Sequence, residues 1–279
     1  MTATPIIPDT ARIGRTALLV ADLDAMVDFY RDVVGLAVHA RDETTATLGV
    51  DETPLLVLKR AENAPARSRE AAGLFHNAFR VPSRTALGAA LERVRDRWQL
   101  DGASDHHVSE ALYLTDPEDN GVEIYRDRPK AEWPRTDDGS VRIGTVSLDL
   151  GDVAAQSDGA ATAPPETTVG HVHLEVSSID AARAFYVDTL GLRVQTAARS
   201  ALFVAAGDYH HHLGLNTWNG RSKPLDGRGL AWFEFVVSDE GALATVRQRL
   251  EGADIFIREQ GRSLEIRDPD GIPIRLRAE

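Results

Sequence analysis

The sequence predicts an α+β fold built from four copies of one βαβββ-like module. The first observation is an internal repeat: the segment VADLDAMVDFYRDVVGLAV, which begins at Val20, aligns with VSSIDAARAFYVDTLGLRV, which begins at Val176. The second is a weaker match, at the same offset, between the segments that begin at Gly73 and Gly229. The third is that the closing strands of these two copies also align, each after an Asp-Pro turn. Such self-similarity indicates one folding unit repeated along the chain.

Each copy of the stronger pair has the residue pattern of a strand, a helix and a second strand. Asp22 and Ser178 stand near the predicted helix starts as caps, and Gly35 and Gly191 stand where a glycine ends a helix. The four predicted modules cover about residues 13–60, 73–128, 168–218 and 229–277.

These modules divide the chain into two parts joined by a linker. Residues 1–130 contain the first two modules, and residues 168–279 contain the last two. Residues 131–167 are polar, rich in Pro, Gly and Ala, and without a helical period, so we expect them to cross the surface between modules. A single module would leave one sheet face exposed. We therefore expect modules to pair, with curved sheets around a cleft.

The composition predicts a soluble globular protein. Hydrophobic residues make up 43% of the 279 residues, a share that excludes bulk disorder. No apolar run approaches a membrane span and the start lacks a signal-peptide pattern, so we expect a cytoplasmic protein. The absence of cysteine excludes disulfides, thiol catalysis and a cysteine zinc site.

The charge disfavours two classes of partner. The formal net charge is −12, and the only lysines are Lys59, Lys130 and Lys223. An acidic surface of this kind repels nucleic acid and anionic membranes, so neither is an expected partner. An acidic, lysine-poor composition is also similar to that of halophilic proteins, in which salt screens the self-repulsion.

The four-module plan resembles the vicinal oxygen chelate superfamily, which includes glyoxalases, antibiotic-resistance proteins and extradiol ring-cleaving dioxygenases. The resemblance covers nearly the whole chain. It implies two glyoxalase/extradiol-dioxygenase-like domains, each made of paired modules whose curved sheets enclose a cleft. In that superfamily the first and last strands of the modules supply the ligands of a metal ion. The fold alone does not choose among the activities.

The residues at the ligand positions differ between modules. In chain order the first strands offer Arg15, His76, His171 and Trp232, and the last strands add Glu123 in the second module and Arg275 in the fourth. Metal-binding side chains thus come from the second and third modules. His76, His171 and Glu123 share one cleft if module 2 pairs with module 3 and module 1 with module 4. This nested pairing is our prediction, and it leaves the other cleft without a metal.

Two histidines and one carboxylate form a facial triad that suits a non-haem Fe(II) ion and leaves three coordination positions open. These positions accommodate a bidentate substrate and dioxygen. Fe(II) is the ion that we expect. Mn(II) also suits a mixed nitrogen and oxygen set, and Zn(II) ranks below both.

The segment from Asp105 to Tyr125, DHHVSEALYLTDPEDNGVEIY, resembles the signature of extradiol dioxygenases. That signature has a histidine, a short spacer, an apolar-Tyr pair, an acidic-Pro turn and a metal-binding glutamate. His106, Tyr113 and Glu123 fill the histidine, tyrosine and glutamate positions. The resemblance implies that His106 and Tyr113 form hydrogen bonds with the substrate oxygens.

The segment YHHHLGLNTW, which begins at Tyr209, resembles the His-His-x-Leu strand of the same enzymes. In those enzymes the second histidine is an acid–base residue of the oxygen pocket, and the resemblance assigns this role to His211. Strand alternation places His210 and His212 on the face opposite to His211, and the sequence leaves open which face lines the cleft. The role of His173 is also left open.

Together these features favour a non-haem Fe(II)-dependent extradiol dioxygenase that inserts both atoms of O2 into a catechol-type aromatic. Its partners are then a small aromatic diol and O2, as in aromatic catabolism. Two alternatives stay open: a glyoxalase-like metal-dependent isomerase or lyase, and a non-catalytic protein of this fold that binds a small aromatic ligand. The sequence also leaves open the ring substituents and the oligomeric state, a homo-oligomer included.

Overall fold

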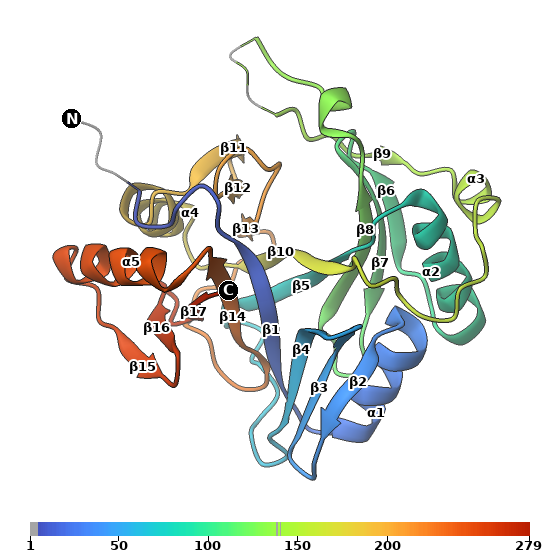
Figure 1. The fold of residues 1–279 in the computed structure, drawn as a ribbon, viewed down its shortest axis with the longest axis horizontal. Helices are drawn as coiled ribbons and strands as arrows, with labels where there is room; N and C mark the ends of the chain where they lie inside the picture. The colour runs from blue at the N-terminus through green and yellow to red at the C-terminus, as the bar shows by residue number, and fades with distance from the viewer. Residues whose placement is uncertain (1–4, 138, 140) are drawn as a thin grey trace. The chain divides into compact units, whose positions relative to one another are not determined.

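The structure, a computed structural model, describes residues 5–137, 139 and 141–279. Residues 1–4, and positions 138 and 140 of the predicted linker, lie outside the described residues. The chain forms four modules in succession, each with one strand, one helical segment and three further strands (Figure 1). The α+β class and the four-module plan predicted from the sequence are confirmed.

The first module contains β1 (Arg12–Val20), α1 (Leu23–Phe29), η1 (Tyr30–Val34), β2 (Ala37–Arg41), β3 (Thr45–Val50) and β4 (Thr53–Arg60). The second contains β5 (Gly73–Arg80), α2 (Arg84–Arg97), β6 (Gly102–Asp105), β7 (Ser109–Thr115) and β8 (Gly121–Asp127). The third contains β10 (Thr168–Glu175), α4 (Ile179–Arg183), η3 (Ala184–Thr189), β11 (Arg193–Ala198), β12 (Ala201–Ala205) and β13 (Leu213–Asn216). The fourth contains β14 (Gly229–Val237), α5 (Glu240–Gly252), β15 (Arg258–Gln260), β16 (Ser263–Arg267) and β17 (Pro273–Ala278).

The connection between the second and third modules contains three short elements that its composition did not indicate. They are η2 (Lys130–Glu132), β9 (Val146–Ser147) and α3 (Leu150–Ala154). Helix α3 begins where the Asp149 carboxylate accepts hydrogen bonds from the backbone N–H groups of Gly151 and Asp152. Strand β9 pairs with β6 of the second module. The connection is therefore attached to that module along part of its length.

The strands form two sheets. One has the order β15-β16-β17-β14-β1-β4-β3-β2, and the other has the order β11-β12-β13-β10-β5-β8-β7-β6-β9. In the last three modules the first strand pairs in parallel with the last strand. This pairing brings side chains of the first and last strands of one module next to each other.

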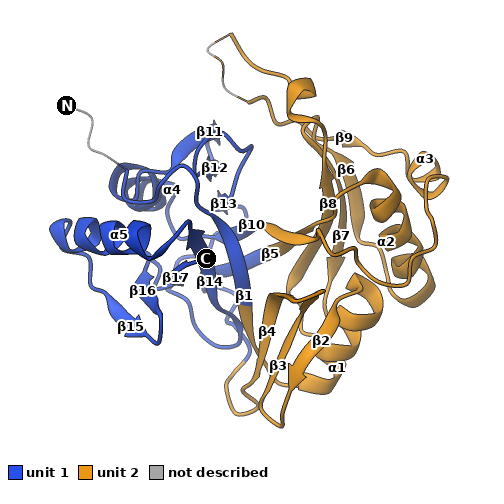
Figure 2. Ribbon diagram, viewed as in Figure 1, with its two compact units in different colours: residues 1–16, 66–75, 171–279 blue, residues 17–65, 76–170 orange. Residues whose placement is uncertain are grey.

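The chain divides into two compact units (Figure 2). One unit comprises residues 1–16, 66–75 and 171–279, and the other comprises residues 17–65 and 76–170. Three of the boundaries fall inside β1, β5 and β10, so each of these strands contributes to both units, and the fourth lies between β4 and β5. Among the described residues, no helix combines the length and the apolar character that a membrane crossing requires.

The helical segments of the first and third modules begin and end near the residues predicted from the sequence. The Asp22 carboxylate accepts hydrogen bonds from two backbone N–H groups of the first turn of α1, at 3.0 and 3.1 Å. The Ser178 hydroxyl caps α4 by accepting from a backbone N–H at 3.2 Å. Gly35 ends η1 with a φ of 91°, and Gly191 follows η3 with a φ of 81°. Both conformations are left-handed and favour glycine.

Two tyrosines at equivalent positions connect the helical segments of the first and third modules to turns of the following modules. The Tyr30 hydroxyl donates to Asp116 at 3.0 Å, and the Tyr186 hydroxyl donates to Asp268 at 2.9 Å. Each aspartate belongs to the Asp-Pro turn before the closing strand of the following module. All four residues are buried. We call the two pairs the tyrosine latches.

Candidate metal centre and active site

His76, Glu123 and His171 come together in the structure. They lie on β5, β8 and β10, and each offers one ligand atom such that these atoms all lie within 4.8 Å of one another. Among the residues that the structure describes, no other group of three or more acidic or histidine residues meets this condition. All three side chains are buried, with 6%, 3% and 2% of their residue surfaces exposed.

The strand register explains how two of these residues meet. In the parallel pairing of β5 with β8, His76 lies opposite Gly121 and Glu123 lies opposite Ala78. His76 and Glu123 are therefore diagonal neighbours on two paired strands. Nε2 of His76 lies 2.9 Å from a carboxylate oxygen of Glu123. A buried carboxylate is costly without a compensating positive charge. Two imidazole nitrogens and one carboxylate oxygen at this spacing fit a divalent metal ion.

Tyr113 links these residues to His106. Tyr113 lies opposite Glu123 in the antiparallel pairing of β7 with β8, and its ring centroid lies 5.9 Å from that of His76. Its hydroxyl lies 2.6 Å from Nε2 of His106. Burial, together with the negative charge of Glu123, raises the pKa of Tyr113 well above its ordinary value. The phenol therefore keeps its proton near neutral pH.

The three histidines after Tyr209 lie in a turn and not in a strand. Strand β12 ends at Ala205, Gly207 has a φ of 66°, and β13 begins at Leu213. The strand alternation expected for the triplet is therefore wrong, because the chain reverses direction here before the strand starts. Adjacent rings contact each other instead: Nδ1 of His210 lies 2.7 Å from Nδ1 of His211.

Each histidine of this turn has a different environment. The ring centroid of His211 lies 4.1 Å from that of His171, whereas the His210 centroid lies 6.4 Å from it. The His212 ring points back along the chain, since its Nδ1 accepts a hydrogen bond from the backbone N–H of Ala206 at 3.1 Å. The structure thus brings His211, the candidate acid–base residue, against a candidate metal ligand.

His173 lies in an aromatic cluster on the same face of β10 as His171. Its ring makes edge contacts with Phe75, Phe203 and Trp218, with centroids 5.0 to 5.6 Å away. The Asn216 amide donates a hydrogen bond to Nε2 of His173 at 3.1 Å. The sequence left His173 unassigned and did not indicate these aromatic neighbours, because they come from separate strands.

The equivalent positions of the first and fourth modules hold a different arrangement. The Arg275 guanidinium lies 4.2 Å from the centroid of the Trp232 ring, and that of Arg15 lies 5.6 Å from it. Arg15 donates to the fully buried Glu234 at 2.6 Å. Burial alone would raise the pKa of Glu234, but the hydrogen bonds and charge of Arg15 hold it below its ordinary value. Cation–π contacts and ion pairs thus occupy these positions.

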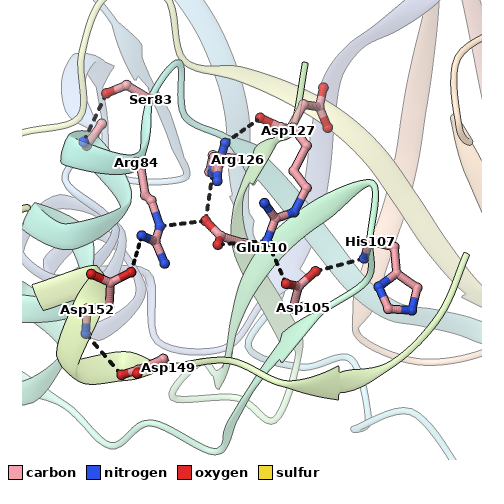
Figure 3. A network of polar contacts seen from close by, with 11 residues as sticks. Ser83, Arg84, Asp105, His107, Glu110, Arg126, Asp127, Asp149 and Asp152 are labelled. Carbon is pink, nitrogen blue, oxygen red and sulfur yellow. Dashed lines mark hydrogen bonds and ion pairs between the residues drawn. The ribbon is translucent and has the colours of Figure 1, made fainter. Parts of the chain in front are cut away.

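A polar network supports the turn that carries His106 (Figure 3). The buried Glu110 carboxylate accepts hydrogen bonds from Arg84, Arg126 and Arg128. Arg128 also donates to Asp105 at 2.6 Å. The network was not predicted, although the sequence contains one signal of it, namely the placement of acidic Glu110 among apolar residues of a strand.

Comparison with known proteins agrees with the fold. The model of the Glyoxalase/Bleomycin resistance protein/Dioxygenase superfamily matches residues 12–124 and 168–276. The chain belongs to this superfamily. It is 38% identical over 272 residues to catechol-2,3-dioxygenase of Bacillus subtilis (strain 168), and the match covers 94% of this chain and 95% of that protein. The resemblance inferred from the sequence is confirmed.

Solved structures show the same fold at low sequence identity. A candidate dioxygenase of Bacillus subtilis superposes with a TM-score of 0.65 at 14% identity, over 96% of this chain and 84% of that one. Glyoxalase I from Zea mays superposes with a TM-score of 0.55 at 15% identity, over 96% of this chain and 92% of that one. These similarities support the architecture and do not distinguish between activities.

Proposed function

We propose that this protein is an extradiol dioxygenase that opens the ring of a catechol-type substrate with O2. One observation carries the proposal: two imidazoles and one carboxylate, all buried, have ligand atoms within 4.8 Å of one another, which is close enough to hold a divalent ion. The chain's 38% identity to a catechol-2,3-dioxygenase, over nearly its full length, supports the choice of reaction. The substrates are then an aromatic diol and dioxygen.

The metal that we propose is Fe(II), held by His76, Glu123 and His171. A bound Fe(II) ion with this ligand set supplies open positions for the two adjacent oxygens of a catechol and for dioxygen, and it acidifies the bound hydroxyl. Mn(II) fits the same mixed ligand set, and Zn(II) ranks third because it lacks redox chemistry.

The surrounding residues of the chain have three roles in this proposal. Tyr113 binds and orients a substrate hydroxyl, and His106 acts with it through the hydrogen bond that joins the two side chains beside Glu123. His211, in contact with His171, holds and transfers a proton on the side where dioxygen reacts. The deep burial of all three ligands excludes bulk water from the reacting atoms.

The proposal includes the nested pairing of modules, in which module 2 pairs with module 3 and module 1 with module 4. The strand order supports this pairing, because β10 is the neighbour of β5 in one sheet and β14 is the neighbour of β1 in the other. In this pairing, the strands that carry the proposed ligands belong to the two paired modules, 2 and 3. The arginine and tryptophan positions then belong to modules 1 and 4.

The test is a reaction with defined components. The protein is loaded with Fe(II) under anaerobic conditions, mixed with catechol and then exposed to air, while oxygen uptake and the absorbance of a yellow ring-fission product are followed. We expect both signals, with equal amounts of oxygen consumed and ring-opened product formed. Controls omit Fe(II) or replace it with Zn(II), and they should give neither signal.

Two other outcomes would replace the proposal. Turnover of a methylglyoxal–thiol adduct without oxygen uptake would identify a glyoxalase-like isomerase. Catechol binding, measured by calorimetry, without turnover in the presence of any of the three metals would identify a binding protein. Either result would contradict a dioxygenase function even though the fold is shared.

A further inference from the structure

A short segment of the connection between the second and third modules holds His106 in place. We call residues 141–147 the strap. Its strand β9 pairs antiparallel with β6, the strand that leads into His106. The Gly144 N–H donates to the His106 carbonyl at 3.1 Å, and Nδ1 of His106 lies 2.7 Å from the Gly144 carbonyl oxygen. The strap therefore contacts both the backbone and the side chain of His106.

These contacts determine where the imidazole hydrogen lies. A carbonyl oxygen only accepts hydrogen bonds, so Nδ1 of His106 carries the hydrogen and donates it to Gly144. The Thr145 hydroxyl lies 3.3 Å from the same nitrogen. In the neutral ring Nε2 then has no hydrogen and accepts one from the Tyr113 hydroxyl, 2.6 Å away.

We propose that the strap is a positioning element of the active site. The Gly144 carbonyl fixes the Nδ1–H tautomer of His106, and His106 thereby orients the Tyr113 hydroxyl so that its oxygen lone pairs are free for the substrate. The site consequently offers a hydrogen-bond acceptor at Tyr113, which suits a substrate hydroxyl that still carries its proton. This inference rests on the proposed function, because it takes His106 and Tyr113 to be site residues.

The opposite side of the turn is anchored independently of the strap. The Asp105 carboxylate accepts a hydrogen bond from the His107 backbone N–H at 2.8 Å (Figure 3). It also accepts one from Arg128 at 2.6 Å, and Arg128 also binds the buried Glu110. The backbone around His106 is thus held by half-buried ion pairs. The strap adds the contact that selects the state of the ring.

Gly144 leaves room for the His107 ring beside the strap. A Cβ atom at this position would lie 2.3 Å from Cδ2 and 2.4 Å from Nε2 of the His107 ring. Gly144→Ala should therefore push the strap away from the turn and break the hydrogen bond to His106. His107 has a φ of 68°, so His107→Gly fits the local backbone. The double variant Gly144→Ala/His107→Gly removes the clash and should restore the hydrogen bond.

The test is nuclear magnetic resonance of the full chain labelled with 15N-histidine, recorded without metal and with diamagnetic Zn(II). Two-bond 15N–1H correlations distinguish the tautomers, and His106→Gln assigns the His106 signals. We expect a protonated Nδ1 in the wild type, loss of this state in Gly144→Ala, and its return in the double variant. Gly252→Ala is the control: a Cβ atom added at this position of α5 would contact no neighbouring atom, so the spectrum should be unchanged.

Turnover gives a second readout. With Fe(II) and catechol, Gly144→Ala should lower kcat/KM about 10-fold at unchanged metal content, and the double variant should recover most of it. A wild-type His106 with its hydrogen on Nε2, or a Gly144→Ala spectrum identical to the wild type, would overturn the inference. Failure of the proposed function would look different: catechol would not be cleaved, whereas the tautomer would still be the one expected.

Discussion

Glu123 is a charged residue that is buried within an apolar strand. Its neighbours Val122 and Ile124 are buried apolar residues, and its carboxylate is buried with them. The His76 ring, 2.9 Å away, compensates this negative charge only when the ring carries a proton on both nitrogens. A divalent ion among the three side chains would supply a compensating positive charge.

Glu123→Gln preserves the size of the side chain and removes its charge. We expect the affinity for Fe(II) to fall by about 100-fold or more, because even the partners of metal ligands contribute factors of about 10 to 100. Ring cleavage should be lost in parallel. Metal content by atomic absorption and oxygen uptake measure the two effects. Asp119→Asn, an exposed carboxylate in the same hairpin, is the control, and equal metal binding in both variants would contradict the assignment of Glu123.

His211→Gln tests the proton-transfer role separately from metal binding. The variant should retain its metal, because His211 is not one of the three proposed ligands. Its kcat should fall about 100-fold, the low end of what a positioned acid–base group contributes. Stopped-flow absorbance after rapid mixing with oxygen measures this rate. The exposed His39→Gln should behave as the wild type, and an unchanged kcat in His211→Gln would exclude the role.

At the scale of elements, the tyrosine latches connect each helical segment to a turn far away in the sequence. The Asp116 and Asp268 carboxyl groups are buried, and burial raises the pKa of each to about 6. Both values lie above the ordinary value of 3.8. The folded protein therefore binds protons at these groups at a pH where the unfolded chain has released them.

The sign of the resulting pH dependence is definite. A raised carboxyl pKa contributes stability that is fully present below the unfolded value of 3.8 and is lost as the pH rises through about 6. Asp116→Asn removes this contribution. Its destabilisation relative to the wild type should be larger near pH 5 than near pH 7 by about 1.3 kcal/mol. Urea unfolding at the two pH values measures the difference, and a constant value would show that Asp116 titrates normally.

The elements differ in how far the sequence predicts them. Caps such as Asp22 and Ser178 and the end of η1 at Gly35 follow from local backbone chemistry, so their positions could be predicted. Helix α3 and strand β9 could not, because a two-residue strand exists only through its pairing with β6. The histidine triplet was wrongly expected in a strand, since the turn at Gly207 depends on packing that the local pattern does not encode.

The candidate site was predictable where the repeat supplied a register. His76 and His171 occupy equivalent positions of their modules, and Glu123 lies in a recognisable signature. The contact between His106 and Gly144 was not predictable, because it joins residues 38 positions apart through a carbonyl group that every residue has. The aromatic neighbours of His173 were not predictable for the same reason. Their contacts depend on the pairing of strands and not on the spacing of the residues in the sequence.

At the scale of the whole molecule, the net charge of −12 opposes the compact state through self-repulsion. Many arginine–carboxylate pairs lie on the surface, among them Arg12–Glu279 and Arg247–Glu259. Exposed pairs of this kind contribute little each, and salt screens them together with the repulsion. The excess of negative charge makes the repulsion the larger of the two effects.

Salt should therefore stabilise the protein. We expect Tm to rise when KCl is increased from about 0.1 M to about 1 M, because the Debye length falls from about 10 Å to about 3 Å. Differential scanning calorimetry at constant pH measures the shift. Sodium perchlorate, matched in ionic strength, separates screening from ion-specific effects. A Tm that falls with KCl would mean that the surface ion pairs outweigh the repulsion.

The stacking of Arg275 on Trp232 has a consequence for spectroscopy. A fixed guanidinium charge stands at the position that corresponds, through the repeat, to a ligand, and it repels any divalent cation that approaches. Under the proposed function, we therefore expect added iron to occupy the site of His76, Glu123 and His171 and not the position of Arg275. Mössbauer or electron paramagnetic resonance spectra of a reconstituted sample can then be assigned to a single species, without subtracting the signal of a second bound population.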